Sequence, residues 1–286
     1  PAVFPDLATR RSSDGGAEHA DAPVGRLEPH RVKAVWPCAG LDLDRPGGGA
    51  LSRPVEPHRN AGGRPADPDV EGLDRVGALD STSIMELEQV PEHLLVLGGG
   101  PTGCELAQVY ARFGVPTTIV QSGPRLAPTD HPRNSEVIRA ALMADGVDVR
   151  LGVRALRADA GAGRDGAHRI SLDDGTFADG HAVLLAAGRT FPLDGLGLEH
   201  YDIDAGGPAP FPRDGCLRIA DGLWVVGDPA GPELHTHQGH YQGELAVRIA
   251  LGDDVLPDYS AIPRAVYTDP EAAGVGLSLE QALAAG

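Results

Sequence analysis

Three glycines at fixed spacing are the residues of this sequence that point most clearly to chemistry. Gly98, Gly100 and Gly103 fill a Gly-x-Gly-x-x-Gly pattern that follows an apolar run at 93–97. In a dinucleotide-binding turn the first glycine permits the tight turn, the second lets a pyrophosphate approach the backbone, and the third lets helix and strand pack closely. A helix that begins after them would offer free N–H groups and a positive dipole end to the phosphates.

The elements around the glycines must support this interpretation. The segment 101–113 is predicted to be a helix that Gly114 ends, and the β-branched run 117–121 is predicted to be a strand. The apolar face of the helix is expected to consist of Leu106, Val109, Tyr110 and Phe113. Strand, glycine turn, helix and strand within 30 residues favour a nucleotide site over a glycine-rich turn that binds nothing.

Further elements continue the same domain. A helix is predicted at 134–145, with Val137, Ile138, Ala141 and Leu142 facing inward, and a strand at 147–151. Three short segments separated by turns predict a β-meander at 153–158, 168–172 and 176–178. The wholly apolar run 182–187, which ends at Gly188-Arg189, is typical of a strand at the centre of a parallel sheet.

Composition excludes several classes of protein. The 286 residues carry a formal net charge of −17, so neither nucleic acid nor an anionic membrane is an expected partner. The three cysteines are too few and too scattered for a disulfide scaffold or a zinc cluster. No apolar run approaches the roughly 20 residues that span a bilayer, and no signal peptide is recognisable, which leaves the cytoplasm as the expected compartment.

A second unit is predicted after residue 190. Strands at 217–219 and 223–226 precede Gly227-Asp228, and a helix runs through Leu245, Ala246 and Ile249. A carboxylate at the end of a buried strand can accept hydrogen bonds from ligand hydroxyls, although Asp228 could instead form a turn that caps the next element. The histidines 235, 237 and 240 are closely spaced, but no cysteine or carboxylate completes a metal site, so polar turn residues are the favoured interpretation.

The first 61 residues differ from the rest. They are dense in Pro, Gly, Arg and His and show no apolar periodicity long enough for an element. Two interpretations are a disordered arm and a stretch translated out of frame from GC-rich DNA. Residues 62–91 are turn-rich, with a capped helical segment expected at 81–87.

Several motifs together resemble one family over residues 62–286. These are the segments 98–105, 185–189, 224–228, 236–237 and 267–271. In this order they resemble the FAD-dependent pyridine nucleotide–disulfide oxidoreductases, the group of dihydrolipoamide dehydrogenase and mercuric reductase, which the chain would cover incompletely at both ends. The resemblance implies an α/β fold in which a Rossmann-type NAD(P)-binding domain (92–190) is inserted in a partial FAD-binding domain (62–91 and 191–259). Residues 260–286 would begin an α+β dimerisation domain.

The resemblance also implies cofactors and site residues. Hydride would pass from NAD(P)H to FAD and then to a small-molecule or disulfide acceptor, a metal ion or a quinone-like compound, and the full-length protein would be a homodimer. The NAD(P)H site would consist of Gly98, Gly99, Gly100, Pro101, Thr102 and Gly103, with Glu105 and Gly188 near the nicotinamide. The FAD site would include Gly227, Asp228, Thr236 and His237, and a helix beginning near Gly239 would point its N-terminus at the flavin.

The choice of nicotinamide nucleotide depends on the end of the second strand. An acidic residue there would bind the ribose hydroxyls of NAD. This chain has Gln121, which does not repel a 2′-phosphate, and Arg125 close by in sequence, which could meet one. The residues therefore lean slightly towards tolerance of NADPH, and the choice between NADH and NADPH stays open.

The sequence departs from the family in ways that keep alternatives open. It shows no first glycine motif for FAD and no Cys-x-x-x-x-Cys pair, and Cys104 is expected to be a small buried residue. No catalytic residue and no metal ligand is therefore assigned. The alternatives are a truncated or frameshifted, non-catalytic NAD(P)-binding fragment and a plain NAD(P)-dependent dehydrogenase without flavin.

Overall fold

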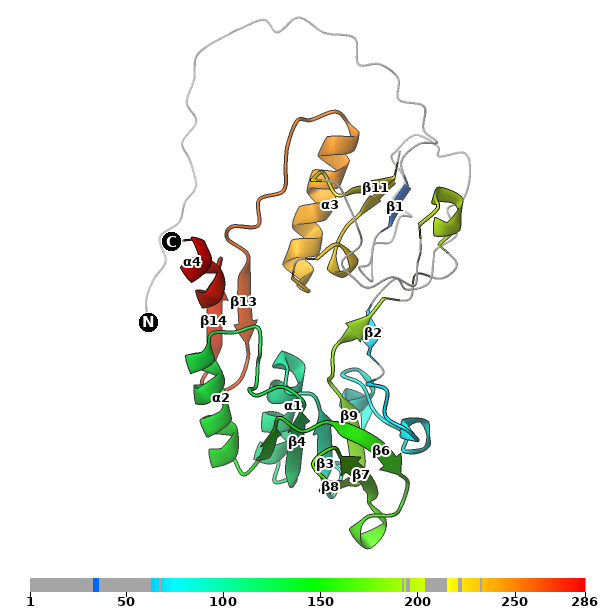
Figure 1. The fold of residues 1–286 in the computed structure, drawn as a ribbon, viewed down its shortest axis with the longest axis vertical. Helices are drawn as coiled ribbons and strands as arrows, with labels where there is room; N and C mark the ends of the chain where they lie inside the picture. The colour runs from blue at the N-terminus through cyan, green and yellow to red at the C-terminus, as the bar shows by residue number, and fades with distance from the viewer. Residues whose placement is uncertain are drawn as a thin grey trace, which may run out of the picture. The chain divides into compact units, whose positions relative to one another are not determined.

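The computed structural model describes most of the chain after residue 62 (Figure 1). The described residues are 33–35, 63–66, 68–191, 193, 196–203, 215–220, 223–231 and 233–285. They all lie within one unit, Val32–Gly286. Most of the first 61 residues therefore fall outside the description, and so do the two interpretations offered for them. The expectation of no element there is wrong at one place, because β1 (Lys33–Val35) pairs in parallel with β12 (Leu223–Val225). A strand of three residues is too short to show a hydrophobic periodicity in the sequence.

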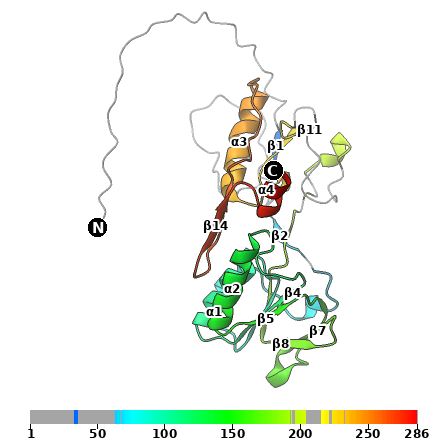
Figure 2. The same cartoon turned by 60° about the vertical axis from the view of Figure 1, so that its left-hand side comes forward.

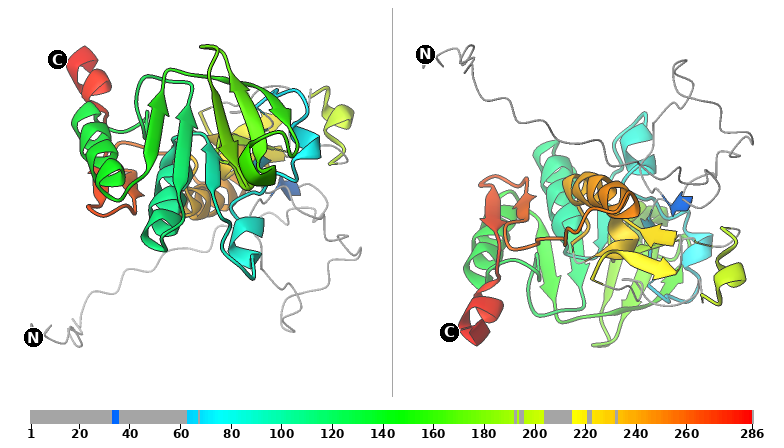
Figure 3. Two further views of the ribbon diagram at one scale, coloured as in Figure 1. Left: turned by 90° about the horizontal axis from the view of Figure 1, so that it is seen from below. Right: turned by 90° about the horizontal axis from the view of Figure 1, so that it is seen from above.

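A parallel sheet of four strands carries the glycine turn (Figure 3). Its strands are β3 (Leu94–Leu97), β4 (Thr117–Gln121), β5 (Asp148–Leu151) and β9 (Ala182–Leu185). They lie in the order β5-β4-β3-β9, and every pair is parallel. The predicted strands are confirmed. Both faces of the sheet are covered, so every residue of β3 is buried and the strand is a continuous apolar run.

Alternate residues of β3 belong to two different hydrophobic clusters. Leu94 and Val96 pack with buried side chains of the helices α1 (Pro101–Arg112) and α2 (Pro132–Ala144). Figure 2 shows the ribbons of these two helices. Leu95 and Leu97 pack with an antiparallel meander on the other face. The meander consists of β6 (Ala155–Asp159), β7 (His168–Leu172) and β8 (Phe177–Gly180), with the short 3₁₀ helix η3 (Arg164–Gly166) between the first two. The predicted meander is therefore confirmed.

The apolar face predicted for α1 is confirmed at Tyr110, which is buried, and at Leu106, which packs against the core, but it is wrong at Val109 and Phe113. Val109 and Phe113 are 43% and 70% exposed, and the helix instead buries the small residues Gly103, Cys104 and Ala107. Small side chains let the axis of α1 approach β3 closely. The side of the helix that faces the sheet is therefore the side that carries the small residues. The inward face of α2 is correct at Ile138 and Leu142, which are fully buried, whereas Val137 is exposed.

The strand expected at the centre of the sheet lies at its end. β9 is last in the strand order, but its outer edge is covered at one residue, because Leu79 N–H donates to Val183 O (2.7 Å) and Leu79 O accepts from Leu185 N–H (2.8 Å). Two short 3₁₀ helices flank this bridge, η1 (Leu73–Arg75) and η2 (Ser83–Glu86). The helical segment expected at 81–87 is therefore a single 3₁₀ turn, fixed by Asp80, whose Oδ1 accepts from Ser83 N–H (2.7 Å).

The second unit forms around a separate cluster of buried side chains. Strands β11 (Arg218–Ala220) and β12 are antiparallel, and α3 (Thr236–Ala250) contributes Leu245 and Ala246 to the cluster. The remaining short elements are β2 (Arg64–Pro65), β10 (Arg189–Thr190), η4 (Leu198–Tyr201) and η5 (Asp228–Ala230). The helix expected to begin near Gly239 begins earlier, at Thr236, so Thr236 and His237 lie in its first turn.

A hairpin after residue 262 is attached to α1. Its strands are β13 (Pro263–Val266) and β14 (Ala272–Val275), and α4 (Leu279–Ala285) follows. Tyr267 N–H donates to Glu105 Oε1 (2.9 Å), Asp269 N–H donates to Gln108 Oε1 (2.7 Å), and Arg112 Nη2 donates to Asp269 Oδ2 (2.9 Å). One face of α1 therefore holds the connection between the two strands. No helix in the described part of the chain is long and apolar enough to cross a membrane.

Candidate functional site: a cavity over the glycine turn

Two of the three motif glycines are required by packing. Gly98 has φ +113°, and a Cβ on it would lie 2.3 Å from Ala186 O. A Cβ on Gly103 would lie 2.1 Å from Gly98 O. Any side chain at either position would therefore separate the end of β3 from α1 or from the end of β9.

Gly100 differs from these two because nothing in the described part of the chain requires glycine there. Its φ of −73° suits any residue, and a Cβ built on it meets no atom within 4 Å. It is the N-cap of α1, with Pro101 as the first helical residue, and no side chain caps the helix there. The N–H groups of the first turn, beginning at Thr102, thus have no partner within the helix.

The turn is held from the side by Gln121, the last residue of β4. Gly99 N–H donates to Gln121 Oε1 (2.7 Å), and Gly98 N–H donates to Val120 O (2.8 Å). A Cβ on Gly99 would lie 2.5 Å from Leu126 Cδ2 and 3.2 Å from Gln121 Cβ. Gln121 therefore fixes the turn as well as standing beside it, a role that sequence reasoning missed.

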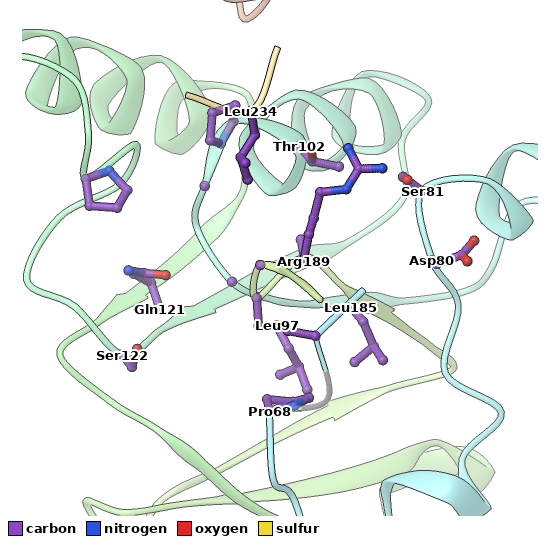
Figure 4. Close-up of a pocket in the computed structure, with 18 of the residues that line it drawn as sticks. Pro68, Asp80, Ser81, Leu97, Thr102, Gln121, Ser122, Leu185, Arg189 and Leu234 are labelled. Carbon is purple, nitrogen blue, oxygen red and sulfur yellow. The ribbon is translucent and has the colours of Figure 1, made fainter. Parts of the chain in front are cut away.

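A cavity of about 800 Å³ lies over the turn and the neighbouring strand ends. Among the predicted site residues, those that line it are Gly98, Gly100, Pro101, Thr102, Gln121 and Gly188. Gln121 and Ser122 lie on the opposite side from Asp80 and Ser81, with Arg189 between them (Figure 4). Lining residues that the sequence did not reveal include Ser122, Arg154 and Arg189. They follow the ends of β4, β5 and β9, and the carboxyl ends of parallel strands meet at one edge of a sheet.

Four of the residues predicted for the NAD(P)H site do not line this cavity. The guanidinium of Arg125 donates to Pro128 O (2.5 Å), three residues away. The carboxylate of Glu105 accepts from the backbone of Tyr267. Gly99 and Gly103 are likewise outside the lining but shape the turn beneath it.

Cys104 lies inside α1 and is fully buried, which confirms its expected character. Burial raises the pKa of its thiol to about 12. Its Sγ donates to Gly99 O (3.4 Å). A thiol with such a pKa is not a thiolate at neutral pH and does not serve as a nucleophile.

The second glycine turn follows β12. Gly227 has φ +76°, and its N–H donates to Gln242 Oε1 (2.7 Å). Asp228 opens η5 without capping it through its side chain; its Oδ2 lies 3.7 Å from Arg189 Nη1. The alternative that the Asp228 carboxylate caps the next element is therefore wrong, because no side chain caps η5.

The histidines at the start of α3 form a stacked pair. The rings of His235 and His237 are 5.0 Å apart and inclined by 15°. Burial, and then the neighbouring His237, lower the pKa of His235. Its Nε2 is buried without a partner in the described part of the chain, and the same holds for Trp224 Nε1. Among the described residues no three His, Cys, Asp or Glu side chains come together as a metal site, and the expectation of no metal stays a prediction.

Comparisons with known proteins agree with the motifs. The family model described as pyridine nucleotide-disulphide oxidoreductase matches residues 61–243. A mercuric reductase from Streptomyces lividans is 35% identical over 233 residues, which are 79% of this chain and 48% of that protein. A dihydrolipoyl dehydrogenase from Thermus scotoductus is 33% identical over 213 residues, 72% of this chain and 46% of that protein. The chain thus spans about half the length of the curated relatives it matches.

Solved structures give the same result. The HOCl-induced flavoprotein disulfide reductase RclA from Escherichia coli matches with a TM-score of 0.69 and 26% identity, over 79% of this chain and 52% of that one. LpdA from Mycobacterium tuberculosis matches with a TM-score of 0.69 and 26% identity, over 79% of this chain and 49% of that one. The predicted α/β fold is confirmed, and the non-catalytic fragment is not favoured over the oxidoreductase.

Proposed function

Because the chain belongs to the pyridine nucleotide-disulphide oxidoreductase family, whose members use FAD and NAD(P)H, we propose that it functions as an FAD-dependent NAD(P)H oxidoreductase. The two cofactors supply the redox chemistry, in which the nicotinamide gives up a hydride that the flavin accepts. The proposed final acceptor is a disulfide, a metal ion or a quinone-like compound. Among the relatives, one is named a mercuric reductase and several are named dihydrolipoyl dehydrogenases.

One observation carries the nucleotide part of this proposal. Gly98 and Gly103 are explained by packing, but Gly100 is not, since a side chain there would meet only the cavity. The missing side chain leaves the backbone at the N-terminus of α1 open to a ligand. That is the arrangement that a pyrophosphate needs.

The strand order then indicates how a dinucleotide would lie. The turn after β3 is central and would hold the pyrophosphate with the N–H groups that begin at Thr102. The adenosine would lie towards the ends of β4 and β5, because the ribose of a dinucleotide is bound at the end of the second strand. The nicotinamide would lie towards the end of β9, where Gly188 lines the cavity. A volume of about 800 Å³ is in the range of cofactor sites.

The flavin would be held by the second unit. Asp228 offers a carboxylate to hydroxyl groups, and the first turn of α3, with Thr236 and His237, offers a positive dipole end. The ring nitrogens Nε1 of Trp224 and Nε2 of His235 are buried without a partner in the described part of the chain, and they fit a polar ligand. The residue ranges assigned to the FAD, NAD(P) and dimerisation domains, the homodimer and the cytoplasmic location all stay predictions.

Substitution of Gly100 tests the nucleotide site. Gly100→Asp keeps a favoured N-cap residue, so folding should be retained, but it puts a carboxylate where the pyrophosphate would lie. We expect the Kd for NADPH to rise at least about tenfold by calorimetry, because like charges repel in a partly enclosed site. Gly100→Asn, the neutral isostere, should give a smaller rise. Unchanged affinity in the folded aspartate variant would rule out a pyrophosphate at this turn.

A second measurement tests the flavin. The purified chain, mixed with FAD and then separated from unbound FAD by gel filtration, should retain flavin absorbance that NADPH bleaches under anaerobic conditions. A chain that binds NADPH but takes up no FAD would instead support the non-catalytic alternative.

A further inference from the structure

The side of the cavity beyond β4 and β5 presents a cation and no carboxylate among its described lining residues. Its polar members are Gln121, Ser122, Thr129 and Arg154. Among the described lining residues the carboxylates are those of Asp80 and Glu233, which come from other segments. Asp80 lies across the cavity from Gln121 in Figure 4. Its Oδ1 already accepts from the N–H groups of Thr82 (2.9 Å) and Ser83 (2.7 Å).

Arg154 is brought to this side by the register of the sheet. Gln121 is the partner of Leu151 across β4 and β5, and the chain then continues alongside, with Val153 N–H donating to Gln121 O (3.2 Å). The backbone N–H of Arg154 donates to Asp173 Oδ1 (2.8 Å), which anchors the segment. Its guanidinium forms no ion pair and no hydrogen bond with any residue that the structure describes.

The other two candidate arginines are already committed. Arg189 follows β9, at the opposite end of the strand order, and its guanidinium faces Asp228 (3.7 Å) and Gly63 O (3.4 Å). Arg125 donates to Pro128 O and does not line the cavity. Arg154 is therefore the cation that this side can offer to a ligand.

Gln121 also favours an anionic ligand on this side of the cavity. Its Oε1 is occupied by Gly99 N–H, so the free part of its carboxamide is the donor Nε2. A site that selects NAD places a carboxylate at this strand end, where it accepts from the ribose hydroxyls and repels a 2′-phosphate. Here the strand ends at Gln121 with its Nε2 donor, the Ser122 hydroxyl follows, and Arg154 lines the same side of the cavity. All three side chains bind phosphate oxygens without repulsion.

We propose that this side of the cavity binds the 2′-phosphate of the adenosine ribose, with Arg154 as the principal specificity-determining residue, so that the protein selects NADPH over NADH. The proposal rests on the proposed function, because it takes the nucleotide to lie over the glycine turn with its adenosine towards β4 and β5.

Calorimetry on the whole chain tests it with four probes: NADPH, NADH, adenosine 2′,5′-bisphosphate and adenosine 5′-monophosphate. The last two need neither nicotinamide nor flavin to bind. Each 2′-phosphorylated probe should bind at least about tenfold more tightly than its partner without that phosphate. Arg154→Ala should abolish this difference and leave the Kd for NADH unchanged. Because the Arg154 side chain is exposed, the variant should fold.

Arg125→Ala is the matched control and should keep the full preference. Loss of the preference in Arg125→Ala but not in Arg154→Ala would overturn the assignment of the residue. Equal or tighter binding of NADH by the unaltered chain would overturn the preference for NADPH while the nucleotide site itself stands. Failure of all four probes to bind would overturn the proposed function along with it.

Gln121→Glu provides a second, independent variant. It keeps the acceptor for Gly99 N–H but adds a negative charge beside Arg154. The affinity for NADPH should fall at least about tenfold relative to that for NADH. An unchanged ratio of the two affinities would show that no phosphate lies at this strand end.

Discussion

The two glycine turns of this protein are held by the same device but use it differently. In the first, Gly99 N–H donates to Gln121 Oε1, and in the second, Gly227 N–H donates to Gln242 Oε1, both at 2.7 Å. Gln242 is fully buried, and its Nε2 donates to Gly231 O (2.7 Å) and Tyr259 Oη (3.0 Å). Gln121 is partly exposed and lines the cavity (Figure 4). The comparison indicates that the Gln242 carboxamide only stabilises the fold, whereas the Gln121 carboxamide stabilises the fold and also leaves its Nε2 donor for a ligand.

The largest effect is expected at the buried carboxamide. Gln242→Leu would leave Gly227 N–H and Gly231 O without their partners, which should lower the free energy of unfolding by about 3 kcal/mol. Urea unfolding followed by circular dichroism measures this loss. If Gln121→Leu lowered stability by the same amount, the two carboxamides would not differ in the way the contacts indicate.

A somewhat smaller loss is expected when a side chain is added inside the first turn. Gly98→Ala forces a φ of +113° on an alanine whose Cβ would lie 2.3 Å from Ala186 O, which should lower stability by about 2 kcal/mol or more. Gly114→Ala is the control, since its φ is +83° but its Cβ would meet no atom within 4 Å. Thermal unfolding should give a lower Tm for Gly98→Ala than for Gly114→Ala. Equal Tm values would mean that the backbone after β9 can move away from the added Cβ.

At the exposed carboxamide, function should suffer more than stability. Gln121→Leu removes one partly exposed hydrogen bond and should lower the free energy of unfolding by about 1 kcal/mol. The affinity for NADPH should nevertheless fall at least about tenfold, because Gly99 is released and a donor that faces the phosphate is lost. Calorimetry beside urea unfolding makes the test, and a loss of stability without loss of affinity would contradict the second role of Gln121.

The smallest expected effect is a dependence of stability on pH at the opposite end of β3. Burial, and then the neighbouring His181, lower the pKa of His93, whose Nε2 lies 3.0 Å from Thr118 Oγ1. The folded protein therefore favours the neutral ring of His93. The stability that the neutral ring contributes is present above the ordinary histidine pKa of about 6.5 and is lost as the pH falls below that value.

Between pH 7.5 and 5.5 this contribution should amount to less than about 1 kcal/mol, since the ring is partly exposed. Urea unfolding at the two pH values, with His93→Gln compared against the exposed His240→Gln, measures it. His93→Gln should reduce the pH dependence, and an undiminished dependence in that variant would place the effect at another group, such as His235 in the second unit.

Sequence reasoning recovered the nucleotide-binding unit because its signals are local. The glycine spacing and the apolar runs on either side place β3, α1 and β4 close to their observed bounds. The inward face of α1 was found only in part, at Leu106 and Tyr110, because bulky Val109 and Phe113 follow the helical period while much of the contact with the sheet uses Gly103 and Ala107.

Arg154 was missed for a related reason. It is distant from Gln121 along the chain, and only the parallel register of β4 and β5 brings the two together. A search of the residues that follow each predicted parallel strand could have found it. Arg125 was chosen instead because it is close in sequence, but the chain turns there and its guanidinium meets Pro128 O.

The attachment of the β13–β14 hairpin to α1 has a thermodynamic consequence. The helix whose N-terminus faces the cavity also carries Glu105 and Gln108, which hold the backbone N–H groups of Tyr267 and Asp269. A ligand that steadies this helix lowers the entropy that the hairpin must lose in order to stay attached, and by reciprocity the attached hairpin tightens the ligand. The two amides would then exchange with deuterium more slowly when nucleotide is bound, although neither lies in the turn that binds it.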